Sequence, residues 1–251
     1  MKRLALKTFV ILCLLATSIG IYGQVPAQMI GDIKIQPLMH SSMHITWNGK
    51  SILSDPYKNE TYYNALASPQ IILITDIHGD HLNLASLKNI NTDQSQIIAP
   101  QAVTDILKEN GYTNIQVLNN GDSRTIDGIK IEAIPMYNLP EDSESRHTKG
   151  RGNGYVLTLG EKRIYISGDT EDIPEMRQLK NIDIAFVCMN LPYTMDVKAA
   201  ASAVLDFNPA IVFPFHYRGG GGKFSDVTLF KELVIDGNDQ IDVRLVDWYQ
   251  Q

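Results

Sequence analysis

The sequence predicts a layered α/β domain. Short apolar runs joined by turn dipeptides predict β-hairpins around Asn48-Gly49, Asp127-Gly128 and Gly160-Glu161. Elsewhere such runs alternate with segments whose apolar residues recur at helical spacing, as in 101–110 and 196–207. Hairpins combined with strand–helix alternation indicate sheets and helices packed in layers.

The predicted strands are short runs of apolar and β-branched residues bounded by turn-forming residues. They span 33–39, 43–47, 50–54, 71–75, 96–99, 115–118, 123–126, 129–134, 154–159, 162–167, 184–189, 211–215 and 242–246. The predicted helices have apolar residues three or four positions apart, and they span 82–89, 101–110, 174–179, 196–207 and 226–233. The chain of 251 residues shows no internal repeat and no low-complexity linker, which suits one domain with a sizeable core.

The densest cluster of ligand-type side chains is Asp76-Ile77-His78-Gly79-Asp80-His81, directly after the apolar run 71–75. Two histidines and two carboxylates in so short a segment indicate a metal site, because alternating side chains can turn toward one centre. The alternative is the start of a helix, with Asp80 capping the segment 82–89 and the histidines facing solvent.

Three other strand ends or loops each supply one more ligand type. His147 lies in a polar, glycine-bearing loop, Asp169 follows the strand 162–167, and His216 ends the strand 211–215. A rigid sheet commonly carries function on the loops at one rim. The sequence therefore predicts that these side chains converge with the segment 76–81.

The order of these motifs resembles the metallo-β-lactamase superfamily: Asp-x-His-x-Asp-His, a later His, Gly-Asp-Thr, and a His-Tyr pair near the C-terminus. Within it, the chain is most similar to ascorbate-6-phosphate lactonase-like and N-acyl phosphatidylethanolamine phospholipase D-like hydrolases. The segments 39–42, 53–57, 152–155 and 164–170 also fit that branch. The resemblance covers almost all of the chain after residue 30. It implies a four-layer αββα sandwich, two sheets face to face with helices outside.

The resemblance also implies a role for each ligand position, with two divalent metal ions held side by side. The first ion would be bound by Asp76, His78 and His147, the second by Asp80, His81 and His216, and both by a bridging Asp169. Such a pair of ions holds a hydroxide near neutral pH, the expected nucleophile, and Asp80 and Asp169 are the expected catalytic carboxylates. Nitrogen and oxygen donors suit zinc, with manganese or iron as alternatives. Asp76 departs from the pattern, since most relatives have histidine there.

Residues near these ligands are candidates for substrate binding. His40 is expected to line the site, and Asp55 to support a ligand rather than to bind the metal. Tyr217 and Arg218 follow His216 directly and lead into the glycine run 219–222, which could present Arg218 to an anionic substrate or be a surface turn. His40 and His44 flank a turn, so one is expected to face the sheet and the other the solvent.

The first residues predict a secretory signal peptide. Lys2, Arg3 and Lys7 precede the short apolar run 9–16, and small residues follow. The run is too short for a comfortable membrane span, and the alternative is an anchor that stays uncleaved. With cleavage after Gly23, residues 1–23 are the leader and 24–251 the hydrolase domain, which is expected to be periplasmic or secreted without a stable membrane span.

Charge and cysteine content narrow the function classes. The formal charge of −6 becomes −9 once the three leader cations are removed, so a nucleic-acid partner is not expected. Cys188 lies within an apolar strand, which predicts a buried thiol rather than a metal ligand.

The sequence thus predicts an exported, dinuclear metal-dependent hydrolase that cleaves an ester-like bond in a small molecule or lipid. A lactone or carboxylic ester is the first expectation and a phosphodiester the second. A non-catalytic metal-binding module is a further alternative, disfavoured because every ligand position holds a ligand-type residue. Sequence leaves the substrate open, since one fold hosts many chemistries.

Overall fold

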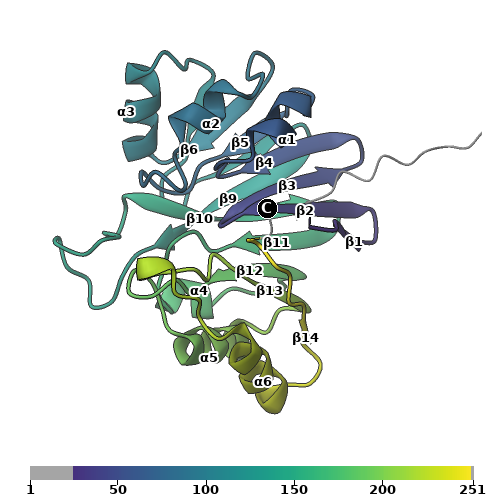
Figure 1. Cartoon of the computed structure of the whole chain (residues 1–251), viewed down its shortest axis with the longest axis vertical. Helices are drawn as coiled ribbons and strands as arrows, with labels where there is room; N and C mark the ends of the chain where they lie inside the picture. The colour runs from purple at the N-terminus through teal and green to yellow at the C-terminus, as the bar shows by residue number, and fades with distance from the viewer. Residues whose placement is uncertain (1–24, 250–251) are drawn as a thin grey trace, which may run out of the picture.

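Two seven-stranded sheets pack face to face with helices on their outer sides in the computed structural model, which describes residues 25–249 (Figure 1). The helices of the first half of the chain, α1 to α3, cover one sheet, and α4 to α6 cover the other. This arrangement confirms the predicted four-layer αββα sandwich.

The first sheet is built in chain order, so each strand lies beside its sequence neighbour. Its strands are β1 (Gln28–Ile30), β2 (Ile33–Met39), β3 (Ser42–Trp47), β4 (Lys50–Ser54), β5 (Ile71–Leu73), β6 (Gln96–Ala99) and β7 (Ile115–Val117). Strands β1 to β4 pair antiparallel, and β4 to β7 pair parallel. The crossovers between the parallel strands carry α1 (Glu60–Ala65), α2 (Leu84–Lys88) and α3 (Gln101–Glu109).

The second sheet is the counterpart, with β8 at one edge and β14 at the other. Its strands are β8 (Ser123–Ile126), β9 (Ile129–Met136), β10 (Gly152–Leu159), β11 (Lys162–Ile166), β12 (Ile184–Cys188), β13 (Ile211–Phe215) and β14 (Asp242–Val243). The hairpins β8–β9–β10–β11 are antiparallel, and β11 to β14 are parallel. Helices α4 (Pro174–Arg177), α5 (Val197–Phe207) and α6 (Val227–Gly237) join the parallel strands, and a 3₁₀ turn, η1 (Gly220–Gly222), follows β13.

The main core lies between the sheets and continues under α4 to α6, while a second apolar cluster fills the space under α1 to α3. Trp248 is fully buried in the main core against Phe186 and Phe215. Its indole N–H donates to the carbonyl of Pro214 at 2.9 Å. The C-terminal segment is therefore held across β13, next to the loop that begins at His216.

Most predicted elements are present, and the structure differs from the prediction at a few elements and element ends. The sequence missed the edge strand β1 and the short helix α1. The strand predicted over 71–75 ends at Leu73, because Thr75 leaves the sheet: its N–H bonds the Asp55 carboxylate and its carbonyl accepts from Asn153 of β10. The predicted strands 115–118, 162–167, 184–189 and 242–246 are also shorter, and α6 is longer, reaching Gly237.

The helix alternative for the metal motif is wrong. Helix α2 begins after Asn83, whose side chain accepts from the N–H of Ser86 at 2.9 Å. Asp80 caps nothing and belongs to the loop before the helix, so its carboxylate is available to the site.

Candidate metal centre

The candidate ligands lie on four loops at one end of the two packed sheets. The loop after β5 carries the segment 76–81, the loop between β9 and β10 carries His147, and Asp169 and His216 follow β11 and β13. The two sheets meet behind this rim, since Asn153 N–H of β10 donates to the carbonyl of Thr75 at 2.9 Å. Residues far apart in sequence are thereby held at one point.

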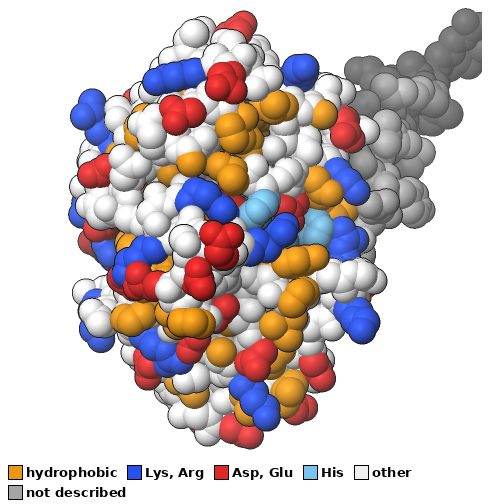
Figure 2. Space-filling view, turned by 90° about the vertical axis from the view of Figure 1, so that its left-hand side faces the viewer, with side chains coloured by type: hydrophobic (Ala, Val, Ile, Leu, Met, Phe, Trp, Pro, Cys, Tyr) orange, Lys and Arg blue, Asp and Glu red, His pale blue; other side chains and the backbone are white. Residues whose placement is uncertain are grey.

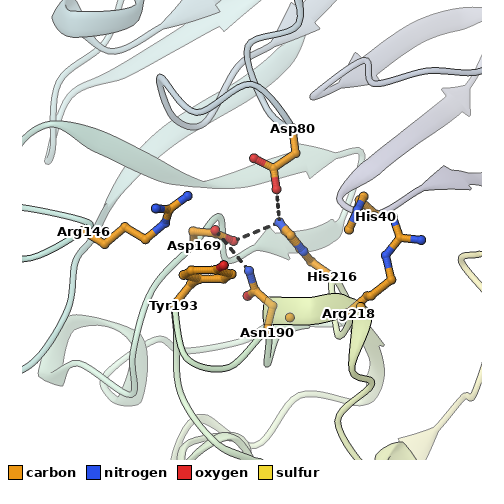
Figure 3. A pocket seen from close by; sticks show the side chains of 10 residues that line it. His40, Asp80, Arg146, Asp169, Asn190, Tyr193, His216 and Arg218 are labelled. Carbon is orange, nitrogen blue, oxygen red and sulfur yellow. Dashed lines mark hydrogen bonds and ion pairs between the residues drawn. The ribbon is translucent and has the colours of Figure 1, made fainter.

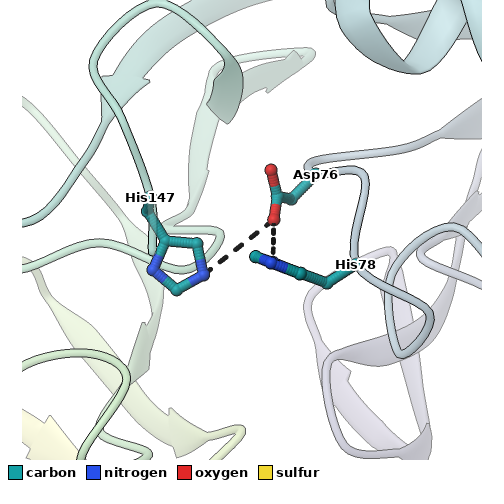
Figure 4. Close-up of side chains that lie close together, drawn as sticks. All are labelled: Asp76, His78 and His147. Atoms are coloured by element: carbon teal, nitrogen blue, oxygen red, sulfur yellow. Dashed lines mark ion pairs between the residues drawn. The ribbon is translucent and has the colours of Figure 1, made fainter. Parts of the chain in front are cut away.

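The first group consists of Asp76, His78 and His147, which point toward one another in Figure 4. Each offers one ligand atom, and these atoms lie within 4.8 Å of one another. Asp76 is fully buried and contacts Nδ1 of His78, and its Oδ2 is 3.9 Å from Nε2 of His147. Three donors this close form a group that can hold one metal ion.

Arg151 gives the first group a feature that the sequence did not reveal. Its Nε and Nη2 donate to the two oxygens of Asp76 at 3.2 and 3.3 Å. Burial alone would raise the pKa of Asp76, but the hydrogen bond from His78 and the charges of neighbouring cations outweigh burial and lower the pKa to about 2. Asp76 is therefore ionised across the physiological range.

The second group consists of Asp80, His81 and His216, again with ligand atoms within 4.8 Å of one another. Nε2 of His216 is 3.2 Å from Nε2 of His81 and 3.4 Å from Oδ2 of Asp80. Burial would raise the pKa of Asp80, but the hydrogen bond from His216 and the charges of His81 and His216 together outweigh burial and lower that pKa below its usual range.

Asp169 lies between the two groups. Its Oδ2 is 3.4 Å from Nε2 of His147 in the first group and 3.4 Å from Nε2 of His81 in the second, while its Oδ1 is 3.4 Å from Nε2 of His216. The Nδ2 amide of Asn190 approaches Oδ2 at 3.4 Å. One buried carboxylate thus contacts histidines of both groups, which is the position of a bridging ligand.

The donor set fits divalent metal ions. Nε2 of His147 and Oδ1 of Asp169 are buried without a hydrogen-bond partner in the described part of the chain. Burying such atoms is costly unless a partner satisfies them, and a cation does so at once. Burial lowers the pKa of His81, yet the charges of Asp169 and Asp55 outweigh burial and raise it well above its usual value. The field that favours a proton here favours a metal ion too.

Asp55 orients His81 from behind. Its carboxylate is fully buried and accepts from Nδ1 of His81 at 2.8 Å, and from the N–H and hydroxyl of Thr75 at 2.8 and 2.6 Å. A proton held on Nδ1 leaves the lone pair on Nε2 facing Asp169. This carboxylate–histidine arrangement is how proteins fix the tautomer of a metal ligand.

Strained backbone marks the same rim. His40, Asp55 and His216 follow β2, β4 and β13 and have φ of 55°, 41° and 44°. Side-chain-bearing residues rarely adopt this left-handed conformation, which costs about 1–3 kcal/mol when it persists at a functional site. Each of the three strands ends by turning its next side chain into the centre.

A cavity of about 410 Å³ opens on the second group and on Asp169 (Figure 3). Besides these ligands it is lined by His40, Arg146, Asn190, Tyr193 and Arg218, together with glycines of the loop after β13. In the space-filling view, pale blue histidines lie in a hollow among blue cationic side chains (Figure 2). The cavity therefore adjoins the site on the side of Asp80 and His216.

His40 lines this cavity, and Arg218 donates to its Nε2 at 2.6 Å. The predicted role of His40 in substrate binding stays a prediction. Burial, with the nearby His216 and Arg218, lowers the pKa of His40 to about 3, so its imidazole is neutral and can accept that bond. The expectation that His40 or His44 faces solvent is wrong, because both are buried. His44 is satisfied by the hydroxyls of Tyr62 and Ser51 at 2.6 and 2.7 Å, so it is a structural residue.

Tyr217 points away from the cavity. It is buried, and its hydroxyl donates to the carbonyl of Val246 at 3.2 Å, so its predicted role in substrate binding stays a prediction. Cys188 is a buried strand thiol as predicted, with its pKa raised by burial to about 12. Sequence reasoning missed Arg146, Arg151 and Asn190, for which no local pattern gives a signal.

A model of the β-lactamase superfamily domain matches residues 34–216. The chain belongs to the metallo-β-lactamase superfamily. A metal-dependent hydrolase of Thermococcus onnurineus is 33% identical over 84% of this chain and 96% of its own length. One of Thermoplasma acidophilum is 32% identical over 76% of this chain and 91% of its own. The protein is thus a metal-dependent hydrolase, and the comparisons leave its branch of the superfamily open.

Solved structures of metal-dependent hydrolases are similar to this chain. A protein from Parabacteroides distasonis described as a metal-dependent hydrolase is 38% identical, with a TM-score of 0.76 over 90% of this chain and 99% of that chain. A metallo hydrolase from Ignicoccus hospitalis shares the fold at 23% identity, with a TM-score of 0.72 over 85% of this chain and 94% of that chain.

The signal peptide and export remain predictions. The predicted signal peptide over 1–23 lies outside the described residues. Between residues 25 and 249, none of the helices has the length and apolar character needed to cross a membrane.

Proposed function

We propose that this protein is a dinuclear metal-dependent hydrolase that cleaves a lactone or carboxylic ester in a small molecule or lipid. The observation that carries the proposal is the position of Asp169, whose carboxylate is 3.4 Å from histidines of both ligand groups. A carboxylate shared in this way suits two ions side by side, with zinc as the expected metal and manganese or iron as alternatives.

The protein's own residues divide the work between them. When bound, the two ions would lower the pKa of a water molecule and polarise the scissile carbonyl. Asp55 fixes the tautomer of His81, and Arg151 holds the Asp76 carboxylate in place. Asp80 is partly exposed toward the cavity and ionised, so its carboxylate can relay a proton toward the leaving group.

A phosphodiester is the second candidate for the scissile bond. The guanidinium groups of Arg146 and Arg218 line the cavity, and guanidinium binds phosphate as readily as carboxylate. The acidic net charge of −6 disfavours nucleic acid as the source of that phosphodiester.

The test combines metal content with a substrate panel. Protein purified without chelator is expected to hold close to two ions per chain and to hydrolyse members of a panel of lactones, carboxylic esters, phosphodiesters and thioesters. Asp169→Asn should lower the content of both ions together and leave turnover near background. Asp236→Asn, a charge removal at an exposed position of α6, is the matched control. Full metal content and turnover in Asp169→Asn would refute the dinuclear proposal.

The N-terminal pattern supports the further proposal that the chain is exported. The intact mass of protein from the native cell envelope should then correspond to a start near Gln24. Full-length protein recovered from the cytosol would contradict export.

A further inference from the structure

Two arginines face the cavity without a carboxylate partner. Figure 3 shows Arg146 with Tyr193 on one side of Asp169 and His216, and Arg218 with His40 on the other side. Within residues 25–249, neither guanidinium forms an ion pair, whereas those of Arg151, Arg163, Arg177 and Arg244 all do. The cavity therefore holds two positive charges that no side chain of the described protein neutralises.

Arg218 is held in a fixed pose. Its guanidinium lies over the ring of Tyr249, 4.7 Å from the centroid, and one of its N–H groups donates to Nε2 of His40 at 2.6 Å. Its backbone N–H donates to the hydroxyl of Tyr249 at 3.0 Å. Because Trp248 anchors the C-terminal segment, Tyr249 is itself well placed. A stacked, half-buried guanidinium keeps its remaining N–H donors in one plane for a ligand.

The hydrogen-bond pattern assigns the protons around His40. Arginine can only donate, so Nε2 of His40 accepts and Nδ1 carries the proton. Nδ1 then donates to the hydroxyl of Tyr249, 3.3 Å away. His40 thereby fixes the orientation of Arg218 without neutralising its charge, which a carboxylate at the same position would do.

Arg146 is more exposed but also oriented. Its guanidinium lies 4.4 Å from the centroid of Tyr193, which lines the same cavity. The carbonyl of Arg146 accepts from Nη2 of Arg151 at 2.5 Å, which ties its loop to the first ligand group. The next N–H along the chain, that of His147, donates to the side chain of Asn138 at 2.8 Å. The peptide group between Arg146 and His147 is therefore held at both its oxygen and its nitrogen.

We propose that Arg218, with Arg146 as a second contact, binds an anionic oxyacid group of the substrate that is separate from the bond cleaved. This inference rests on the proposed hydrolase function and adds a substrate class: esters or lactones that also carry a carboxylate or a phosphate. The planar fork of guanidinium matches both groups. His40 is a positioning residue that acts through Arg218.

The binding test uses metal-loaded protein, titrated calorimetrically with succinate and, separately, with inorganic phosphate. Arg218→Gln is expected to weaken binding of the preferred anion about tenfold or more, as for loss of a charge-assisted hydrogen bond. Arg146→Gln should weaken it by a smaller factor. Arg124→Gln, an exposed arginine on the edge strand β8, is the matched control and should bind as the wild type does. The anion whose binding is weakened by Arg218→Gln shows whether the substrate group bound there is a carboxylate or a phosphate.

The positioning role has its own readout. His40→Gln supplies an oxygen that can accept from Arg218 and should retain anion binding, whereas His40→Leu should lose about as much affinity as Arg218→Gln. Both variants should keep the wild-type metal content. Equal loss in His40→Gln and His40→Leu, or loss of metal in both, would overturn the positioning role.

Kinetics separate this inference from the proposed function. The substrates compared are nitrophenyl esters that differ only in a terminal group, which is a free carboxylate, a phosphate or a methyl ester. An anionic ester should have the higher kcat/KM, and Arg218→Gln should abolish that preference mainly through KM. Hydrolysis without a charge preference would refute the anion site and leave the hydrolase intact. Arginine-dependent anion binding without hydrolysis of any ester in the set would refute the hydrolase and leave the anion site intact.

Discussion

Replacing Asp55 by asparagine should remove His81 from the metal centre while changing almost nothing in shape. In the wild type, three buried donors converge on the Asp55 carboxylate: Nδ1 of His81 at 2.8 Å, and the N–H and hydroxyl of Thr75 at 2.8 and 2.6 Å. In Asp55→Asn, one oxygen still accepts from the Thr75 N–H. The other oxygen becomes an amide group, which can only donate.

The expected consequence is a tautomer switch. Facing an amide N–H, Nδ1 of His81 must become the acceptor, so the imidazole proton moves to Nε2, the atom 3.4 Å from Asp169. A protonated Nε2 cannot bind a metal ion. Loss of such supporting carboxylates typically lowers metal affinity about 10- to 100-fold, which corresponds to about 1.4–2.8 kcal/mol.

The assay is competition with a chromogenic chelator, together with ¹⁵N chemical shifts of the histidine rings, which report the tautomer. The second ligand group should weaken by that factor, and the metal content should fall toward one ion per chain. Asp32→Asn is the matched control, because exposed Asp32 also accepts a hydrogen bond, from the indole of Trp47 at 2.8 Å. Unchanged affinity for both ions in Asp55→Asn would show that Asp55 does not control His81.

Three further predictions concern other parts of the centre and the fold. Asp76→Ala should selectively empty the first group of its metal ion and strongly lower activity, whereas Asp76→His should keep the group occupied and change the metal preference. Metal analysis and kinetics measure both effects. Two bound ions and full turnover in Asp76→Ala would exclude Asp76 as a ligand. Gly168→Ala should destabilise the protein by about 1–3 kcal/mol and displace Asp169, because φ is +61° and a Cβ would lie 2.6 Å from Sδ of Met136 and 2.9 Å from the Asn153 carbonyl oxygen. Gly79→Ala, with no atom near its Cβ, is the control, and equal urea midpoints for the two variants would contradict this reasoning. Burial and the charge of Lys34 lower the pKa of His44 from 6.5 to about 4, so the unfolded chain binds the proton first on acidification. The contribution of His44 to the free energy of unfolding should therefore be complete above about pH 6.5 and fall by about 1.4 kcal/mol per pH unit toward pH 4. Urea titrations at several pH values measure this slope, and His44→Asn should remove it. The same slope in the wild type and in His44→Asn would refute the prediction.

Most strands and all the candidate ligand residues could be predicted from the sequence, because the signals that mark them are local. Apolar runs and turn dipeptides defined most strands, and the motif 76–81 with His147, Asp169 and His216 contained every residue of the two ligand groups and the aspartate between them. These residue types carry their chemistry wherever they lie. Their order along the chain was enough to indicate the superfamily to which the chain belongs.

Errors at element ends came from contacts that sequence does not display. The run 71–75 is apolar enough to continue as a strand, yet Thr75 leaves the sheet because Asp55 and Asn153 bind its backbone. Because His40 and His44 flank a turn, only one of them was expected to be buried. Both are buried, because Arg218 and Tyr62 supply hydrogen-bond partners that the sequence does not display.

The sequence alone determined which side chains can bind metal, because ligand chemistry belongs to the residue. Only the tertiary structure decided how those side chains are supported and what surrounds them. It placed Asp55 behind His81, Arg151 against Asp76, and Arg146 and Arg218 on opposite sides of the cavity. The contact that orients Arg218, with His40, joins residues 178 positions apart in the sequence. The physical reason is that orientation, charge balance and access depend on distances between chain segments, which are set when the two sheets pack and not by any local pattern.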